Sequence, residues 1–332
     1  MSRNSKLSLQ LLTLILMLIG AVLTWTNPLF ASDKVHYQAT YKGVFSLYQS
    51  MKIADVVYTV SDHPVDKDHS MQQIRLWVTS ERFGTVEKLY PFRYLYKSFF
   101  QPVSQQTLGF ENLKQTKKKK KLKHQVGLLD FNQKRVQLYS SPAGKELLSP
   151  GNIIGIIGQQ DLAISARKLA LTEKARPLEN LPVLPIDRLT MLEAIRQQLI
   201  KGTEEQHYRV TNGDELFDYR VTLLKNQAIK LSAVDYDTRK IKIEAFRVAH
   251  DESQPQSQAF SEDLSHLQVK DKGYAHAPVY VWFTTAAPYR AVKFLNKHAV
   301  GNFIIEMVEA ESPVSEKLTQ LDSTQLDSIQ LK

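Results

Sequence analysis

Apolar and polar residues alternate along most of this chain, which is the pattern of strands with one buried face. The clearest run covers residues 35–42, where Val, Tyr, Ala and Tyr at odd positions alternate with His, Gln, Thr and Lys. Runs rich in Val, Ile, Tyr and Phe predict further strands over residues 54–60, 74–79, 93–99, 135–139, 217–224, 229–236, 241–248, 279–284, 291–295 and 303–308. Asn212-Gly213-Asp214 predicts a turn between strands, because Gly readily takes a positive φ.

The middle of the chain has the period of a helix instead. An apolar stripe at spacings of three, three and four residues consists of Leu189, Leu192, Ile195 and Leu199. The signals at its ends are Pro185 and Asp187, the capping-box spacing of Thr190 and Glu193, and the terminator Gly202. Residues 161–171 predict a shorter helix. The stripe either packs against a sheet or lines a groove for an apolar ligand or a partner.

The order of strands, a helical middle and strands again predicts the fold class. We expect one α+β domain, mainly antiparallel β, in which a large curved sheet of half-barrel shape wraps around one or two helices. A curved sheet with a helix in its mouth has a shape that can hold an apolar ligand.

The two ends of the chain differ from this domain. Residues 1–31 start with Arg3 and Lys6, continue with an uncharged apolar run over 7–25 and end on Leu29-Phe30-Ala31, the layout of a secretory signal peptide. An uncleaved anchor is the alternative, because the run is close to the roughly 18–20 residues that span a bilayer. The β-rich domain then covers residues 32–311. Residues 312–332, which contain a tandem pentapeptide, predict a disordered polar tail.

Composition narrows the range of functions. The chain has no cysteine, which excludes disulfides, thiolate metal sites and a cysteine nucleophile. Its net charge of +9 falls to +7 once Arg3 and Lys6 leave with a signal peptide. A basic surface suits anionic lipid headgroups, acidic glycans or acidic partners, and nucleic acid is not an expected partner of an exported protein.

Five consecutive lysines are the sharpest local feature. The cluster comprises Lys114, Lys117, Lys118, Lys119, Lys120, Lys121 and Lys123. Like charges at this density repel one another, so the stretch is expected to be solvated. One interpretation is an exposed hairpin whose lysines protect a sheet edge against aggregation. The other is a patch for anionic lipid or glycan, to which each lysine contributes roughly 1 kcal/mol near a charged membrane.

Two further clusters have a structural and a functional interpretation. Residues 62–69 hold two histidines and three aspartates, but they lack the glycine and glutamate of a calcium loop and the spacing of a zinc site, so a polar turn is preferred to a metal site. Aromatic side chains gather at Tyr90, Phe92, Tyr94, Tyr96, Phe99 and Phe100. The first four share one strand face. This face either packs in the core or forms a stacking surface for sugars or acyl chains.

Catalytic and cofactor motifs are missing from the sequence. There is no Gly-x-Ser-x-Gly elbow, no His-Glu-x-x-His helix and no phosphate-binding loop, so the sequence predicts no cofactor, no metal and no catalytic residue. A pair of carboxylates that meets only in the fold is the remaining route to glycan chemistry. Its candidates are Asp62, Asp66, Asp68 and Asp235.

The chain resembles the bacterial domain of unknown function family 3108 over nearly the whole mature length. The residues that carry the resemblance are 41–45, 90–98, 184–191, 278–284, 290–294 and 300–303, and it departs from the family at Arg188 and Ala291, where Pro is common. The resemblance implies an exported β-rich protein without established activity. The family's curved sheet over a helix looks like periplasmic carriers of lipoproteins, a likeness of fold only.

Three functional hypotheses follow. The first is a non-enzymatic periplasmic binding or carrier protein for a lipid, an acyl chain or a lipidated partner, whose basic hairpin meets an anionic membrane. The second is a structural envelope protein that binds another protein. The third is an envelope enzyme acting on glycan or peptidoglycan. The sequence carries no signal for an oligomeric state.

Overall fold

The computed structural model describes residues 33–65, 70–116, 122–141, 146–158, 161–173, 178, 181, 184–202, 204–213, 215–247 and 277–308. Several predictions fall outside these residues: the signal peptide over 1–31, the tail over 312–332, Asp66, Asp68 and the lysines 117–121.

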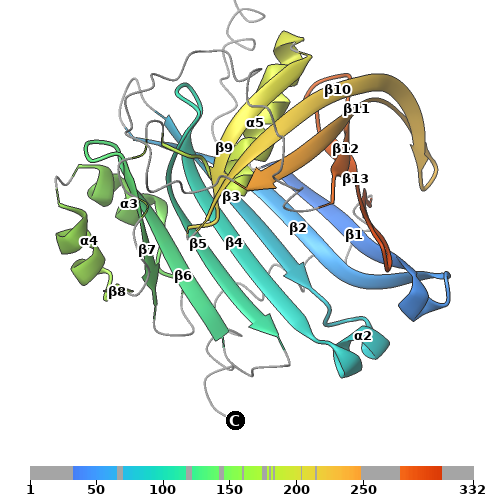
Figure 1. Cartoon of the computed structure of the whole chain (residues 1–332), viewed down its shortest axis with the longest axis horizontal. Coiled ribbons are helices and arrows are strands. Elements are labelled where there is room, and N and C mark those ends of the chain that lie inside the picture. The colour runs from blue at the N-terminus through green and yellow to red at the C-terminus, as the bar shows by residue number, and fades with distance from the viewer. Residues whose placement is uncertain are drawn as a thin grey trace, which may run out of the picture.

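One antiparallel sheet contains every strand of the described residues. In chain order the strands are β1 (Asp33–Gly43), β2 (Ser50–Pro64), β3 (Ser70–Thr79), β4 (Phe92–Gln101), β5 (Gln106–Thr116), β6 (Leu122–Asp130), β7 (Arg135–Ser140), β8 (Thr172–Glu173), β9 (Glu205–Thr211), β10 (Leu216–Leu231), β11 (Val234–Arg247), β12 (Val279–Thr284), β13 (Ala291–His298) and β14 (Gly301–Met307). Their order across the sheet is β8-β7-β6-β5-β4-β3-β2-β1-β14-β13-β12-β11-β10-β9. The predicted mainly antiparallel fold, with one large curved sheet, is confirmed (Figure 1).

This order follows from simple connections. Each strand from β1 to β8 and from β9 to β14 pairs with its neighbour in the chain, as short hairpin connections favour. The first and last strands, β1 and β14, pair in the middle of the sheet, where Tyr37 lies opposite Met307 and Gly43 opposite Gly301. The edges are therefore β8 and β9, the strands that flank the helical middle of the chain.

The helices lie on both faces of the sheet. They are α2 (Gly84–Leu89), α3 (Pro150–Ile157), α4 (Leu162–Lys168) and α5 (Arg188–Lys201), with a 3₁₀ turn η1 at Val44–Ser46. The N-terminus of α5 contacts Ser98 of β4, and α3 and α4 pack in one cluster with the neighbouring Phe99. Successive side chains of a strand point to opposite faces, so α5 occupies the concave face while α3 and α4 cover the convex one (Figure 1).

A connecting segment joins the two ends of the curved sheet. Leu178 exchanges two backbone hydrogen bonds of 2.9 and 3.0 Å with Val136 of β7, and Ile186 exchanges two of 2.9 Å with Arg209 and Thr211 of β9. Leu138 of β7 and Leu216 of β10 pack in one buried cluster beside this segment. The connecting segment therefore bridges the two ends of the open sheet at this junction, with α5 on its concave side.

Several expectations from the sequence need correction. The strand predicted over 229–236 is interrupted by a turn: residues 229–231 belong to β10 and 234–236 to β11, and Ser232 takes φ 54° between them. Asp187 is the N-cap of α5, as predicted, but Thr190 lies inside the helix, so Thr190 and Glu193 form no capping box at its start. Of the two predicted helices, only the one starting at Asp187 lies inside the sheet. The strands on either side of residues 117–121, β5 and β6, are internal to the sheet.

Four strands, β5, β6, β8 and β9, were not predicted from the sequence, and in β5 and β6 the reason is that buried positions carry polar residues. Glu111 of β5 and His124 of β6 are both buried and in contact with each other, with 2.6 Å between Oε1 and Nε2. These two residues break the apolar alternation that a half-buried strand shows. In β9, the polar sequence Glu205–Thr211 has no such alternation.

Candidate functional site

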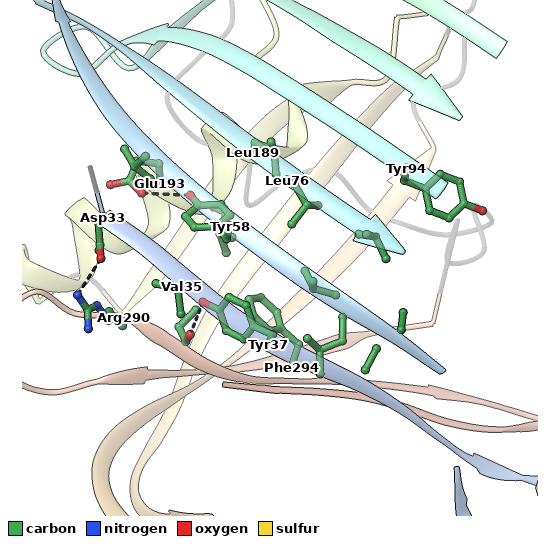
Figure 2. A pocket seen from close by; sticks show the side chains of 18 of the residues that line it. Asp33, Val35, Tyr37, Tyr58, Leu76, Tyr94, Leu189, Glu193, Arg290 and Phe294 are labelled. Atoms are coloured by element: carbon green, nitrogen blue, oxygen red, sulfur yellow. Dashed lines mark hydrogen bonds and ion pairs between the residues drawn. The ribbon is translucent and has the colours of Figure 1, made fainter. Parts of the chain in front are cut away.

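An elongated cavity of about 1060 Å³ lies on the concave side of the sheet. It is bounded by β1 to β4 on one side and by β12 to β14 and the N-terminal half of α5 on the other. Its lining follows β2 from Ile53 to Asp62, a span of roughly 30 Å at about 3.3 Å per residue. Figure 2 shows side chains from these strands and from α5 converging on this space.

Strand alternation makes the long walls of the cavity apolar. Inward-facing positions recur at every second residue of β1 to β4, and these positions carry mostly aliphatic and aromatic side chains. The apolar lining residues are Val35, Ala39, Ile53, Ala54, Val56, Val60, Leu76, Val78, Phe92, Leu189, Leu192, Phe283, Pro288, Ala291, Phe294, Phe303 and Ile305. The cavity is thus a long slot in which an apolar chain would make contacts along its whole length.

One end of the cavity is polar. Glu193 of α5 is almost completely buried, and it accepts hydrogen bonds from Arg196 Nε at 2.5 Å and from Tyr58 Oη at 3.4 Å. Arg196 also donates to the carbonyl oxygen of Pro288 at 2.9 Å. Burial, with the negative charge of Glu193, raises the pKa of Tyr58 well above its usual value, so this phenol is protonated at neutral pH and acts as a hydrogen-bond donor.

Further polar contacts surround this end. Arg290 Nη2 donates to Asp33 Oδ1 at 2.7 Å, and Gln72 Nε2 donates to Asp62 Oδ1 at 2.6 Å. Burial also raises the pKa of Tyr37, whose hydroxyl donates to the carbonyl oxygen of Ala291 at 2.7 Å. Each of these carboxylates already has a partner within the protein.

The opposite end of the cavity is aromatic and partly open. Tyr90, Tyr94, Phe92 and Phe303 line it. Tyr90 and Phe303 are 48% and 38% exposed, so their rings face both the cavity and the solvent. The Lys114 ammonium lies 5.1 Å from the centre of the Tyr94 ring, a cation–π contact at this end.

The structure divides the predicted ligand face of α5. Leu189 and Leu192 line the cavity. Ile195 and Leu199 are 0% and 2% exposed and belong to a core cluster with strands β9 to β12. The helix is covered by different strands along its length, and its part from Leu189 to Arg196 borders the open space.

The other predicted site residues are scattered. Lys114 and Lys123 are exposed and lie opposite each other on β5 and β6. Of the two described candidates for glycan chemistry, Asp62 lines the cavity, whereas Asp235 lies at the start of β11, opposite Lys230 of β10. These two carboxylates do not form the pair that the enzyme hypothesis requires.

The apolar stripe did not indicate the polar residues of α5 as part of the site. Glu193 follows Leu189 by four residues and Arg196 follows Leu192 by four, a spacing that places each pair on one side of the helix. This signal was available in the sequence. Tyr58 could not be linked to them, because it lies 135 residues away from Glu193 in the chain.

Within the described ranges, no group of three or more His, Asp or Glu side chains is placed to hold a metal ion. Over the same residues, no helix has the length and apolar character needed to cross a membrane.

Comparisons with known proteins add little beyond the structure itself. No family model matches the chain, and no curated protein matches it. A β-barrel-like protein of domain of unknown function DUF1849 from Brucella abortus aligns at a TM-score of 0.45 and 9% identity, over 85% of this chain and 97% of that one. A candidate exported protein with a YmcC-like fold from Bacteroides fragilis aligns at a TM-score of 0.25 and 8% identity, over 82% and 92% of the two chains. The β-rich fold implied by the resemblance to family 3108 is present, and membership of that family stays a prediction.

Proposed function

We propose that this chain is a non-enzymatic binding or carrier protein that holds an elongated apolar ligand, an acyl chain of a lipid or of a lipidated partner, in the concave cavity. The observation that carries the proposal is the cavity of about 1060 Å³ left open beside α5. Protein interiors are normally close-packed, and this volume is at the upper end of the ~300–1,000 Å³ range of ligand sites.

The polarity of the cavity supports an amphipathic ligand. Its long apolar walls suit a hydrocarbon chain, since each methylene group removed from water contributes about 0.8 kcal/mol. The protonated phenol of Tyr58 and the guanidinium of Arg196 lie at one end, where they would contact the polar group of the ligand.

The cellular location is part of the same proposal. Residues 1–31 have the layout of a secretory signal peptide, and the resemblance to family 3108 implies an exported protein. A carrier that works in the periplasm, between the membranes of the envelope, would account for the signal-peptide layout, the resemblance to an exported family and the apolar cavity. An exported interaction protein without a small ligand is the alternative that the experiment below separates from it.

The test is native mass spectrometry of the protein purified gently from the periplasm, followed by denaturing mass spectrometry of the same sample. We expect a stoichiometric lipid or lipopeptide on the wild-type protein. Leu192→Trp fills part of the cavity and should abolish this ligand, whereas Leu224→Trp, at a 44% exposed position of β10, should retain it. Val78→Phe, also in the cavity wall, repeats the test if Leu192→Trp folds poorly.

A second measurement uses a defined probe. Titration with a fluorescent polyene fatty acid should show saturable binding to the wild-type protein and to Leu224→Trp, and binding at least about tenfold weaker to Leu192→Trp. A ligand-free native mass together with no saturable probe binding would overturn the proposal.

A further inference from the structure

Exposed apolar side chains concentrate at one end of the molecule. The described residues include twelve large hydrophobic side chains that are exposed, and eight of them lie at this end. We call these eight the apolar rim: Val44, Phe45, Leu47, Tyr48, Leu89, Tyr90, Val300 and Phe303. Phe45, Leu47 and Tyr48 are 78%, 83% and 67% exposed. Scattered exposed hydrophobics are ordinary, but a cluster of this kind marks an interaction site.

Strand register brings the rim together from separate parts of the chain. The turn between β1 and β2 meets the turn between β13 and β14, because Gly43 lies opposite Gly301. The connection from β3 to β4 leaves the sheet at the same end, where Thr79 pairs with Arg93. Figure 1 shows α2 and the hairpin that joins β1 and β2 on the same side of the sheet.

The first of these turns is built to hold its apolar side chains outward. Leu47 and Tyr48 have φ values of 51° and 60°, a left-handed conformation that is unfavourable for residues other than glycine. Backbone hydrogen bonds fix it: Tyr48 N donates to Gly43 O at 2.8 Å, and Val44 N donates to Val300 O at 3.1 Å. Residues held in such conformations are concentrated at functional sites.

The surroundings of the rim are basic. Segments 41–52, 79–93, 112–116, 122–126 and 296–303 contain six lysines and two arginines against two glutamates, Glu81 and Glu87, and Glu87 is paired with Arg93. All six are exposed: Lys42, Lys52, Lys88, Lys114, Lys123 and Lys297. Apolar side chains surrounded by lysines match an anionic lipid surface, which attracts each lysine with roughly 1 kcal/mol and accepts the apolar groups below its headgroups.

We propose that the apolar rim docks onto an anionic phospholipid bilayer, with Phe45, Leu47 and Tyr48 inserted below the headgroups. Tyr90 and Phe303 belong both to the rim and to the cavity lining. Docking would therefore place the aromatic end of the cavity against the membrane, where an acyl chain could pass between the two. The exchange of ligand rests on the proposed function, whereas docking itself does not.

The test introduces tryptophan as a depth probe. Phe45→Trp, mixed with vesicles of phosphatidylethanolamine and phosphatidylglycerol, should give a blue-shifted emission that brominated lipids quench. Val103→Trp is the matched control, because Val103 is 91% exposed in the turn between β4 and β5, at the other end of these strands. Its emission should not change. Vesicles of phosphatidylcholine alone should bind the protein more weakly, and added salt should weaken binding to the anionic vesicles.

Removal of the inserted side chains gives the complementary result. The double variant Phe45→Ser and Leu47→Ser should reduce co-sedimentation with anionic vesicles by at least about tenfold. Its circular dichroism and thermal midpoint should match the wild type, since both side chains are exposed. Equal quenching of Phe45→Trp and Val103→Trp, or self-association through the rim without vesicle binding, would overturn the proposal. The same double variant should keep the polyene fatty acid site, so failure of docking and failure of ligand binding are distinguishable.

Discussion

Glu111 illustrates at the residue scale how a buried charge joins distant parts of the chain. Its carboxylate lies 2.6 Å from His124 Nε2 and 3.6 Å from Lys97 Nζ, and it accepts backbone hydrogen bonds of 2.7 and 3.0 Å from Leu147 and Leu148. Burial acts to raise the pKa of Glu111, but the contacts with His124, Lys97 and the two amides outweigh it and hold the pKa below its usual value of 4.5. The carboxylate thereby fixes residues 146–148 to the convex face of β5.

A pH dependence follows from this lowered pKa. A carboxylate with a folded-state pKa below its unfolded value stabilises the fold above pH 4.5, and it loses that contribution as the pH falls from there towards the folded-state pKa. Glu111→Gln removes one of the two carboxylates beside Lys97, which keeps Glu146, and should cost about 1–3 kcal/mol at neutral pH through the weakened charged hydrogen bonds. The difference between variant and wild type should shrink as the pH falls below 4.5.

Urea unfolding midpoints measured from neutral to acidic pH provide the check. Glu205→Gln is the control, because the Glu205 side chain is 52% exposed and its loss should change stability by no more than about 0.5 kcal/mol. A wild-type to Glu111→Gln difference that stays constant across the pH range would contradict the assignment.

At the scale of an element, the start of α5 is fixed by its cap. Asp187 is completely buried, and its Oδ1 accepts from the amides of Leu189 and Thr190 at 2.8 and 3.3 Å. Its Oδ2 accepts from the hydroxyls of Ser98 and Thr107 at 2.5 and 2.9 Å. The cap therefore also attaches the helix to β4 and β5, which holds Leu189 and Glu193 beside the cavity.

Asp187→Ala should accordingly destabilise the protein more than an ordinary cap mutation. Loss of the cap costs about 0.5–2 kcal/mol, and the buried hydroxyls left without a partner add about 1–3 kcal/mol. Asp161 is the exposed N-cap of α4, and its carboxylate accepts a hydrogen bond from the amide of Ala163 at 2.7 Å. Asp161→Ala should therefore cost only the free energy of a lost cap, about 0.5–2 kcal/mol. Denaturant unfolding of both variants measures the difference, and equal losses would argue against the attachment role of Asp187.

At the scale of the whole molecule, the approach of the two ends of the open sheet depends on a close contact where they meet. Gly213, in the turn between β9 and β10, has φ 109°, a conformation outside the range that other residues normally take. A Cβ atom at this position would lie 2.5 Å from Leu138 Cδ1 of β7. Gly213 therefore lets the two sheet ends approach each other.

Gly213→Ala should loosen this junction and cost about 2 kcal/mol or more. Gly202→Ala is the matched control: Gly202 caps α5 with φ 76°, and no atom lies within 4 Å of the added Cβ, so the cost should be about 1 kcal/mol. Hydrogen exchange should report faster exchange at Leu178 and Ile186 for Gly213→Ala and no local change for Gly202→Ala. Unchanged protection at both amides would show that the junction tolerates the methyl group.

The sequence by itself determined the local elements of this protein. Alternation over 35–42 and in the carboxy-terminal runs predicted strands, and the stripe from Leu189 to Leu199 predicted α5, because each element buries one face and leaves the other in water. Gly202 and Gly213 marked their turns, because both positions require a positive φ. The same reasoning failed at Glu111 and His124, where two polar side chains are buried as a pair.

Only the tertiary structure decided which of these faces is filled and which stays open. Leu192 and Ile195 carry the same signal in the sequence, yet Leu192 borders the cavity and Ile195 is packed beneath β9 to β12. In the sequence Phe45 likewise cannot be told from a buried apolar residue, whereas the turn conformation places its side chain in solvent. Periodicity records which residues share a face of an element, whereas the cavity, its polar end and the apolar rim depend on what lies opposite that face, and residues far apart in the chain supply those partners.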